Sequence, residues 1–218
     1  MTQAFLFDFD GVIVDSERHW MALDRNFFPT VAPGFTEAHA AAMMGLNLRA
    51  GYDYLVRELR LSLAFEEYQE RLKAKVHRVY HELATPLPGL AELLALLEHL
   101  RIPVAIASSS EPEWIEACLA RLGLRARFGS ISTPPDVGGR AKPHPDVYLH
   151  AAKQCGAAPA RCIAIEDSRN GIAAAKAAGM ICIALQTDMN PHQDLTQADT
   201  VVHSLTEVTE ALLLQLAR

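Results

Sequence analysis

The chain has 218 residues, of which 50% are hydrophobic and 21% are charged, and its formal net charge is −6. This balance is typical of a folded cytosolic protein with a substantial core, arranged as one large domain or two small ones. The Lys and Arg residues are scattered, so no basic stripe can follow a phosphodiester backbone, and nucleic acid is not expected as a partner. No apolar run approaches the ~20 residues that span a bilayer, and the N-terminus lacks the basic flank of a signal peptide. We therefore expect a cytoplasmic protein without membrane contact.

Short apolar runs rich in β-forming residues predict buried strands. Four are clear, at residues 4–9, 103–107, 162–165 and 181–185, and two weaker runs at 128–132 and 200–202 bring the expected number to five or six. Helix-length segments with apolar residues three and four apart, such as 90–97 and 115–122, lie between the later runs. Strands that alternate with helices predict an α/β fold with a doubly wound parallel sheet.

Residues 17–83 interrupt this alternation, because they contain no convincing strand and several amphipathic helical patterns. One apolar stripe joins Phe65, Leu72, Val76 and Val79 between charged residues. The Pro-rich segment 85–89 then ends the helical pattern. We expect a helical insertion here, with the chain returning to the sheet after residue 83.

Asp8 and Asp10 follow the first predicted strand. Ligands of a parallel sheet collect at the carboxyl ends of its strands, and side chains at i and i+2 of an extended segment project to the same side. One carboxylate can then attack phosphorus while its neighbour transfers protons. A calcium loop is a poor alternative because Gly11 is followed by the apolar residues 12–14, whereas a plain acidic turn stays open.

Three serines, residues 108–110, follow the second predicted strand and precede a predicted helix. The Ser108 hydroxyl and the backbone N–H groups at the start of that helix are suited to hold phosphate oxygens. Ser110 and Glu113 also fit a capping box, so three serines that only cap a helix are the alternative.

Lys142 lies in the loop 140–146, just before a helix that begins at Pro145. The anionic Asp8 must approach an anionic phosphate, and a lysine beside both would lower their repulsion. A lysine that is merely solvated is the alternative.

Glu166 and Asp167 follow the strand predicted at 162–165. Mg²⁺ prefers oxygen ligands and takes one or two protein carboxylates, so these two residues, Asp8 and the carbonyl of Asp10 form a reasonable shell. The metal would screen charge and orient the phosphate. The alternative role for Asp167 is a helix N-cap.

These four segments follow strands in a fixed order, and the combination resembles the haloacid-dehalogenase (HAD) superfamily over essentially the whole chain. The similar subgroup has a small helical cap and contains sugar phosphatases and β-phosphoglucomutase. The resemblance implies a Rossmann-like core of residues 1–16 and 84–218 with a cap domain of residues 17–83. It implies these roles: Asp8 as nucleophile and metal ligand, Asp10 as general acid/base and metal ligand through its carbonyl, Ser108 and Ser109 as phosphate-binding residues, Lys142 as the catalytic cation on the phosphate, and Glu166 and Asp167 as ligands of Mg²⁺.

The cap departs from the mutase pattern. β-Phosphoglucomutase typically carries Gly-Val-Ser-Arg, with the Arg on a second phosphate, whereas this chain reads Gly45-Leu46-Asn47-Leu48-Arg49. A slip of one residue on a helix turns a side chain by about 100°, which puts a phosphate contact by Arg49 in question. Arg18, His19, Arg49 and Lys73 are the polar cap residues that are candidates for contacting the organic part of a substrate.

The expected function is Mg²⁺-dependent hydrolysis of a small phosphorylated metabolite, a sugar phosphate or a sugar-derived acid. The alternatives are a phosphosugar mutase, and a phosphate- or metal-binding protein without turnover. The sequence leaves a monomer and a small homo-oligomer equally open.

Overall fold

The computed structural model describes residues 2–43 and 46–217. It confirms the predicted α/β fold, with a parallel sheet of six strands in the order β3-β2-β1-β4-β5-β6. The strands are β1 (Ala4–Phe7), β2 (Val104–Ala107), β3 (Ile131–Ser132), β4 (Cys162–Glu166), β5 (Ile181–Leu185) and β6 (Thr200–Val202). Both weak runs form strands, although β3 keeps only two residues of its predicted five.

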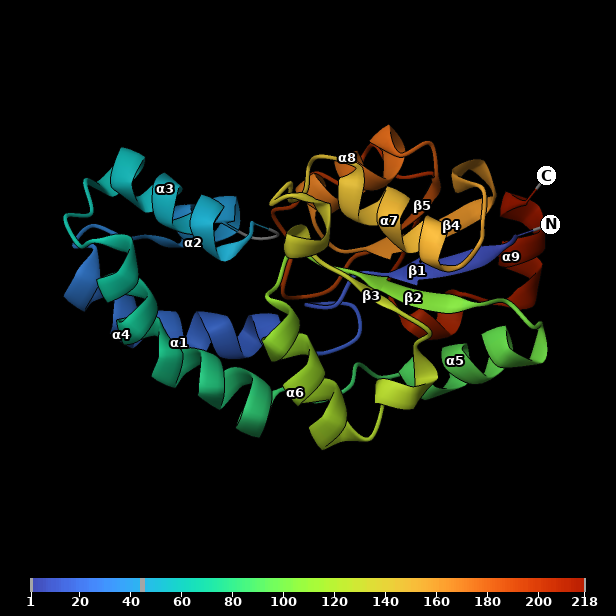
Figure 1. Cartoon of the computed structure of the whole chain (residues 1–218), viewed down its shortest axis with the longest axis horizontal. Helices are drawn as coiled ribbons and strands as arrows, with labels where there is room; N and C mark the ends of the chain where they lie inside the picture. Colours follow the sequence, from blue (N-terminus) through green and yellow to red (C-terminus); the bar gives the residue numbers. More distant parts are fainter. Residues whose placement is uncertain (1, 44–45, 218) are drawn as a thin grey trace.

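The sheet is buried on both faces, as a doubly wound fold requires. Successive side chains of β1 alternate: Phe5 and Phe7 belong to one hydrophobic cluster, and Ala4 and Leu6 to the other. The first cluster includes α5 (Leu90–His99), α6 (Pro112–Leu122) and α9 (Glu210–Leu216), and the second includes α7 (Asp146–Gln154) and α8 (Arg169–Ala177). In Figure 1, α7 and α8 lie on one side of the sheet and α5 and α6 lie on the other. Short 3-10 helices lie in the connections between these elements: η2 (Arg125–Arg127), η3 (Pro134–Val137), η4 (Pro159–Arg161) and η5 (Leu205–Glu207).

The strand order reverses between β1 and β4, which are neighbours in the sheet although most of the chain separates them. A crevice opens outside the carboxyl ends of strands at such a point, and ligands bind there. Asp8 follows β1 directly, and Glu166 and Asp167 lie at the end of β4. The fold therefore brings these three carboxylates to one edge of the sheet.

Between β1 and α5 the chain forms a helical lobe beside the sheet (Figure 1). Its elements are α1 (Ser16–Val31), α2 (Glu37–Met43), α3 (Leu48–Leu59), α4 (Phe65–His77) and a π-helical turn η1 (Arg78–Leu83). None of the described residues in 17–83 belongs to a strand, as expected for a helical insertion. The exact domain boundaries stay a prediction. Within the described ranges, no helix is long and apolar enough to cross a lipid bilayer.

The two chain segments that connect the helical lobe to the sheet lie side by side and are joined by hydrogen bonds. The backbone N–H of Asp15 donates to the Thr85 carbonyl at 3.0 Å, and the Asp15 carboxylate accepts from the Thr85 N–H at 2.6 Å. Leu87 N–H donates to the Ile13 carbonyl at 2.9 Å. These bonds fix the point from which the helical lobe extends over the carboxyl edge of the sheet.

Candidate active site

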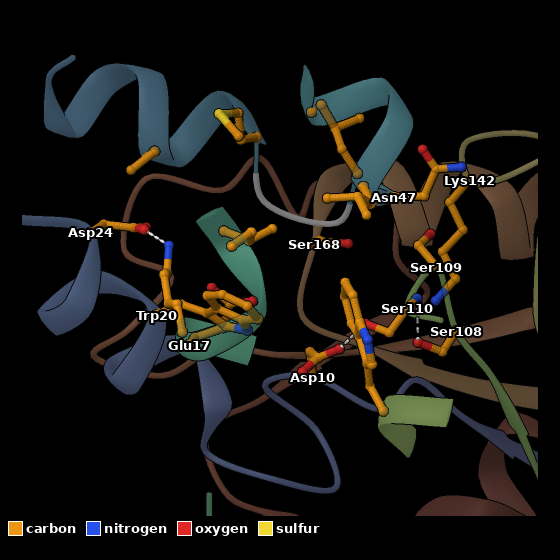
Figure 2. A pocket seen from close by; sticks show the side chains of 18 of the residues that line it. Asp10, Glu17, Trp20, Asp24, Asn47, Ser108, Ser109, Ser110, Lys142 and Ser168 are labelled. Atoms are coloured by element: carbon orange, nitrogen blue, oxygen red, sulfur yellow. Dashed lines mark hydrogen bonds and ion pairs between the residues drawn. The ribbon is translucent and has the colours of Figure 1, made fainter. Parts of the chain in front are cut away.

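A cavity of about 160 Å³ lies between the helical lobe and the carboxyl edge of the sheet. Residues from all four predicted segments line it: Asp8, Asp10, Ser108, Ser109, Ser110, Lys142, Asp167 and Ser168. Figure 2 shows Asp10, the serines and Lys142 together on one side of this space. Six of the residues predicted from the sequence therefore face one cavity.

The backbone that carries Asp8 and Asp10 has a different conformation from the predicted one. Strand β1 ends at Phe7, so the expectation of an extended segment through Phe9 was wrong. The chain turns instead, with Gly11 N–H donating to the Val14 carbonyl at 2.8 Å. Gly11 has φ +75°, and a Cβ there would lie 2.0 Å from Oδ2 of Asp167, so only glycine fits this turn.

Lys142 is buried between two carboxylates. Its Nζ lies 2.5 Å from Oδ1 of Asp8 and 2.5 Å from Oε1 of Glu166. Burial disfavours the charge, but the Asp8 and Glu166 carboxylates outweigh burial and raise the pKa of Lys142 above its ordinary value. The two carboxylates therefore favour the charged form of Lys142, and because its side chain is buried, the solvated-lysine alternative does not apply.

Glu166 is completely buried, and both of its oxygens already have protein donors. Oε1 accepts from Lys142 and, at 2.8 Å, from the hydroxyl of Tyr148. Oε2 accepts from the Ser168 hydroxyl at 3.1 Å. A Cβ at position 171 would lie 1.8 Å from Oε1, so Gly171 makes room for this carboxylate. These contacts make Glu166 an anchor for Lys142, and direct metal ligation by Glu166 stays a prediction.

Three buried carboxylates, Asp8, Glu166 and Asp167, form a cluster that could bind a metal ion, with one oxygen of each within 4.8 Å of the others. Burial and the neighbouring Glu166 raise the pKa of Asp8 to about 7. Burial and the neighbouring Asp8 raise the pKa of Asp167 well above its usual range. The cluster thus has more negative charge than Lys142 alone can balance, as expected for residues that hold a cation. The N-cap of α8 is Ser168, which accepts from Gly171 N–H at 3.1 Å, so the N-cap alternative for Asp167 was wrong.

The carboxylate of Asp10 accepts hydrogen bonds from three hydroxyls. Oδ1 accepts from Ser16 at 2.5 Å and from Tyr80 at 2.8 Å, and Oδ2 accepts from Ser110 at 2.5 Å. The predicted capping box of Ser110 and Glu113 was therefore wrong, since α6 has Glu111 as its N-cap and the Ser110 hydroxyl is bonded to Asp10. Sequence reasoning missed Tyr80, which comes from the π-helical turn η1 and shows no local signal of this role.

We expect Tyr80→Phe to lower kcat about tenfold and to lower the thermal midpoint by several degrees. The substitution keeps the aromatic packing but removes one charge-assisted hydrogen bond to Asp10, and such a bond contributes about 1.5–3 kcal/mol. Steady-state phosphate release and a melting curve measure both effects. A kcat equal to that of the parent would show that the Tyr80 hydroxyl does not help to position Asp10.

Ser108 and Ser109 are both buried at the edge of the cavity. The Ser108 hydroxyl accepts from the Ser110 N–H at 3.0 Å, which leaves its own hydrogen available to a ligand. The Ser109 hydroxyl has no hydrogen-bond partner among the described residues. Because buried hydroxyls normally find partners, the Ser109 hydroxyl is suited to donate to a ligand that enters the cavity.

Arg49 does not line the cavity. Its side chain is 61% exposed, its Nε lies 3.0 Å from Asp53, and its guanidinium packs over the ring of Phe65. The structure therefore does not bring Arg49 to the phosphate-binding residues, and a phosphate contact by this residue stays a prediction. Gly45, the first residue of the cap segment compared with the mutases, lies outside the described residues.

The lobe contributes a different set of polar residues to the cavity from those expected. Glu17, Asp24 and Lys75 line it, whereas Arg18, His19 and Lys73 do not. Lys75 is 7% exposed and forms an ion pair with Asp24. A sequence signal for it existed, because position 75 lies three residues after Leu72 and four before Val79, on the buried stripe of the helix. Burial lowers the pKa of Lys75, and the nearby Glu17 opposes that shift.

We expect the metal-free protein to lose about 2 kcal/mol or more of unfolding free energy between pH 5 and pH 7. Burial raises the pKa of Glu17 to about 8, and Asp8 and Asp167 are shifted in the same direction. Unfolded carboxyls release their protons near pH 4, so in this window the native state binds more protons and becomes less stable as pH rises. Urea unfolding in a chelator measures the effect. Mg²⁺ should restore more stability at pH 7 than at pH 5, and a stability that rises across this window without metal would contradict the account.

Comparison with known proteins supports the same class of enzyme. The family model of haloacid dehalogenase-like hydrolases matches residues 5–185. Hexitol phosphatase B of Escherichia coli (strain K12) is 30% identical over 209 residues, 94% of each chain. Beta-phosphoglucomutase of Bacillus subtilis (strain 168) is 28% identical over 218 residues, 97% of this chain and 93% of that one. The crystal structure of CbbY from Rhodobacter sphaeroides in complex with phosphate has a TM-score of 0.78 at 25% identity, covering 95% of this chain and 96% of that one.

The chain therefore belongs to the haloacid dehalogenase-like hydrolase family. It is an enzyme, a hydrolase of the phosphatase kind.

Proposed function

We propose that the protein hydrolyses the phosphate monoester of a small sugar or sugar derivative, with Asp8 as the nucleophile. The observation that carries the proposal is the placement of Asp8 and Asp10 on one cavity, with Lys142 at 2.5 Å from Asp8 and the Ser109 hydroxyl unpaired nearby. A nucleophile, a proton-transfer group, a fixed cation and phosphate donors are then present together. The sugar-phosphatase relatives point to the same substrate class.

The residues divide the reaction into two steps. In the first, a carboxylate oxygen of Asp8 attacks phosphorus, the bond to the leaving oxygen breaks, and Asp10 protonates that oxygen. In the second, Asp10 takes a proton from water, the water oxygen attacks phosphorus, and the bond to Asp8 breaks. The products are the alcohol and inorganic phosphate; Asp8 returns as a carboxylate, and Asp10 returns as the carboxylic acid that donated the proton in the first step.

Mg²⁺ fits the acidic cluster, because Asp8 and Asp167 are buried oxygen donors with raised pKa values, and Lys142 is the one nearby counter-charge among the described residues. Asp8, Asp167 and the carbonyl of Asp10 would hold the ion, with Glu166 as a further candidate. When bound, Mg²⁺ supplies positive charge against the transferring phosphoryl group. Lys142 supplies a second positive charge, and the serine hydroxyls orient the phosphate oxygens.

The experiment that tests this function separates hydrolysis from phosphoryl transfer to a second hydroxyl. The protein is incubated with Mg²⁺ and sugar phosphates, including β-glucose 1-phosphate, and both free phosphate and isomerised sugar phosphate are measured. We expect stoichiometric release of phosphate. Glucose 6-phosphate formed without free phosphate would instead establish a mutase, and no turnover of any sugar phosphate would refute the proposed substrate class.

The position of Arg49 favours hydrolysis over the mutase reaction. A mutase must hold a second phosphate at the far end of its site, and this requires a cation there. Arg49 is exposed and paired with Asp53, outside the cavity.

A further inference from the structure

Among the described residues, the helical lobe supplies one cation to the cavity, and the charge of that cation is balanced by a carboxylate. Lys75 on α4 forms an ion pair with Asp24 on α1. Its ammonium also lies 4.6 Å from the ring centroid of Trp20 and 5.0 Å from that of Phe28. In Figure 2, Asp24 lies at the end of the cavity away from Ser108 and Lys142. In the proposed reaction the phosphate lies against Ser108 and Lys142, so the part of the substrate that leaves with the ester oxygen extends toward this end.

Every cation that lines the described part of the cavity is paired with a carboxylate. The lining residues that the structure describes include two cations, Lys142 and Lys75, and each has a carboxylate partner. Glu17, the remaining charged residue from the lobe, carries no positive charge in either protonation state. The two undescribed residues inside the lobe, at positions 44 and 45, are Met and Gly and add no charge. No unpaired cation therefore faces the leaving group among the described residues.

We propose, resting on the function above, that the leaving group is an uncharged polyol and that Asp24 excludes substrates with a second anionic group. A second phosphate or carboxylate would lie near Asp24 without a free cation to balance it, and unbalanced charge in a desolvated site is strongly disfavoured. Hydroxyl groups suit the same surface, since they donate to the carboxyl oxygens of Glu17 and Asp24 and accept from Lys75. The apolar rings of Trp20 and Phe28 border this end.

The test compares kcat/KM for sorbitol 6-phosphate, 3-phosphoglycerate and fructose 1,6-bisphosphate with saturating Mg²⁺. We expect the parent enzyme to prefer sorbitol 6-phosphate by at least about tenfold. In Asp24→Asn, Lys75 loses its partner, and the preference should fall by about tenfold or reverse. Glu67→Gln is the matched control, because it removes one negative charge from the exposed face of the same lobe, where Glu67 pairs with Arg71.

A parent enzyme that prefers phosphoglycerate or the bisphosphate would overturn the proposal, and so would an unchanged preference in Asp24→Asn. If Asp24→Asn does not fold, the substrate preference of the parent enzyme and the kinetics of a second variant, Glu17→Gln, test the proposal instead. That variant should lose more kcat/KM with sorbitol 6-phosphate than with acetyl phosphate, which lacks a polyol, and equal losses would count against the proposal. Failure to release phosphate from any of these compounds, acetyl phosphate included, would refute the proposed function itself.

Discussion

Asp8→Asn is expected to lower phosphate release by at least about 10⁴-fold, because an amide cannot replace the carboxylate that attacks phosphorus. The side chain at this position is buried, and asparagine has nearly the same shape as aspartate. The fold should therefore persist, and the amide oxygen can still accept a hydrogen bond from Lys142. Steady-state assays with excess substrate measure the loss, and a melting curve verifies the fold.

Asp188→Asn is the matched control for this variant, since Asp188 lies in the loop after β5 and does not line the cavity. It should keep the parent rate. Turnover of a good substrate by Asp8→Asn at the parent rate would rule out Asp8 as the nucleophile.

Lys142→Met should reduce both activity and stability. The substitution leaves Asp8 and Glu166 buried without their shared cation, and removal of one partner from such a pair costs about 3–5 kcal/mol. Without Lys142 the pKa of Asp8 rises further, so less of the nucleophile is ionised at neutral pH. We expect kcat/KM to fall by about 10³-fold or more, measured alongside urea unfolding.

Lys153→Met provides the control, because Lys153 is an exposed lysine on the adjacent helix α7. It should change kcat/KM and unfolding free energy little. A Lys142→Met enzyme as stable and active as Lys153→Met would show that the buried cation has neither role.

Much of this fold could be predicted from local sequence patterns. Buried strands of a doubly wound sheet are continuous apolar runs, so β4 and β5 were predicted within about one residue. Residues that directly follow such strands meet at one edge of the sheet, which is why Asp8 and Asp167 could be associated without coordinates. The turn after Phe7 could not be predicted from the local sequence, because it depends on the close approach of Gly11 to Asp167, a contact between distant segments.

The residues that support the site were harder to predict, because their partners lie far away in the sequence. Tyr80 donates a hydrogen bond to a residue 70 positions earlier, and Tyr148 donates one to a residue 18 positions later. Neither contact can be predicted from the local sequence pattern. Lys75 could have been noticed as a charged residue on an apolar helical stripe. Its partner Asp24 lies 51 residues away on another helix, so only the packing of α1 against α4 identifies the pair.

The central claim is that phosphate passes through a covalent bond to Asp8, and Asp10→Asn offers the most direct test. With acetyl phosphate the first step needs little help from a proton donor, whereas the second step still needs Asp10 to activate water. The phosphoryl enzyme should therefore accumulate, with a hydroxylamine-labile phosphoryl group on the peptide that contains Asp8, detected by mass spectrometry after acid quench. A phosphoryl group on any other residue, or rapid phosphate release by this variant with no acyl phosphate on the protein, would contradict the mechanism.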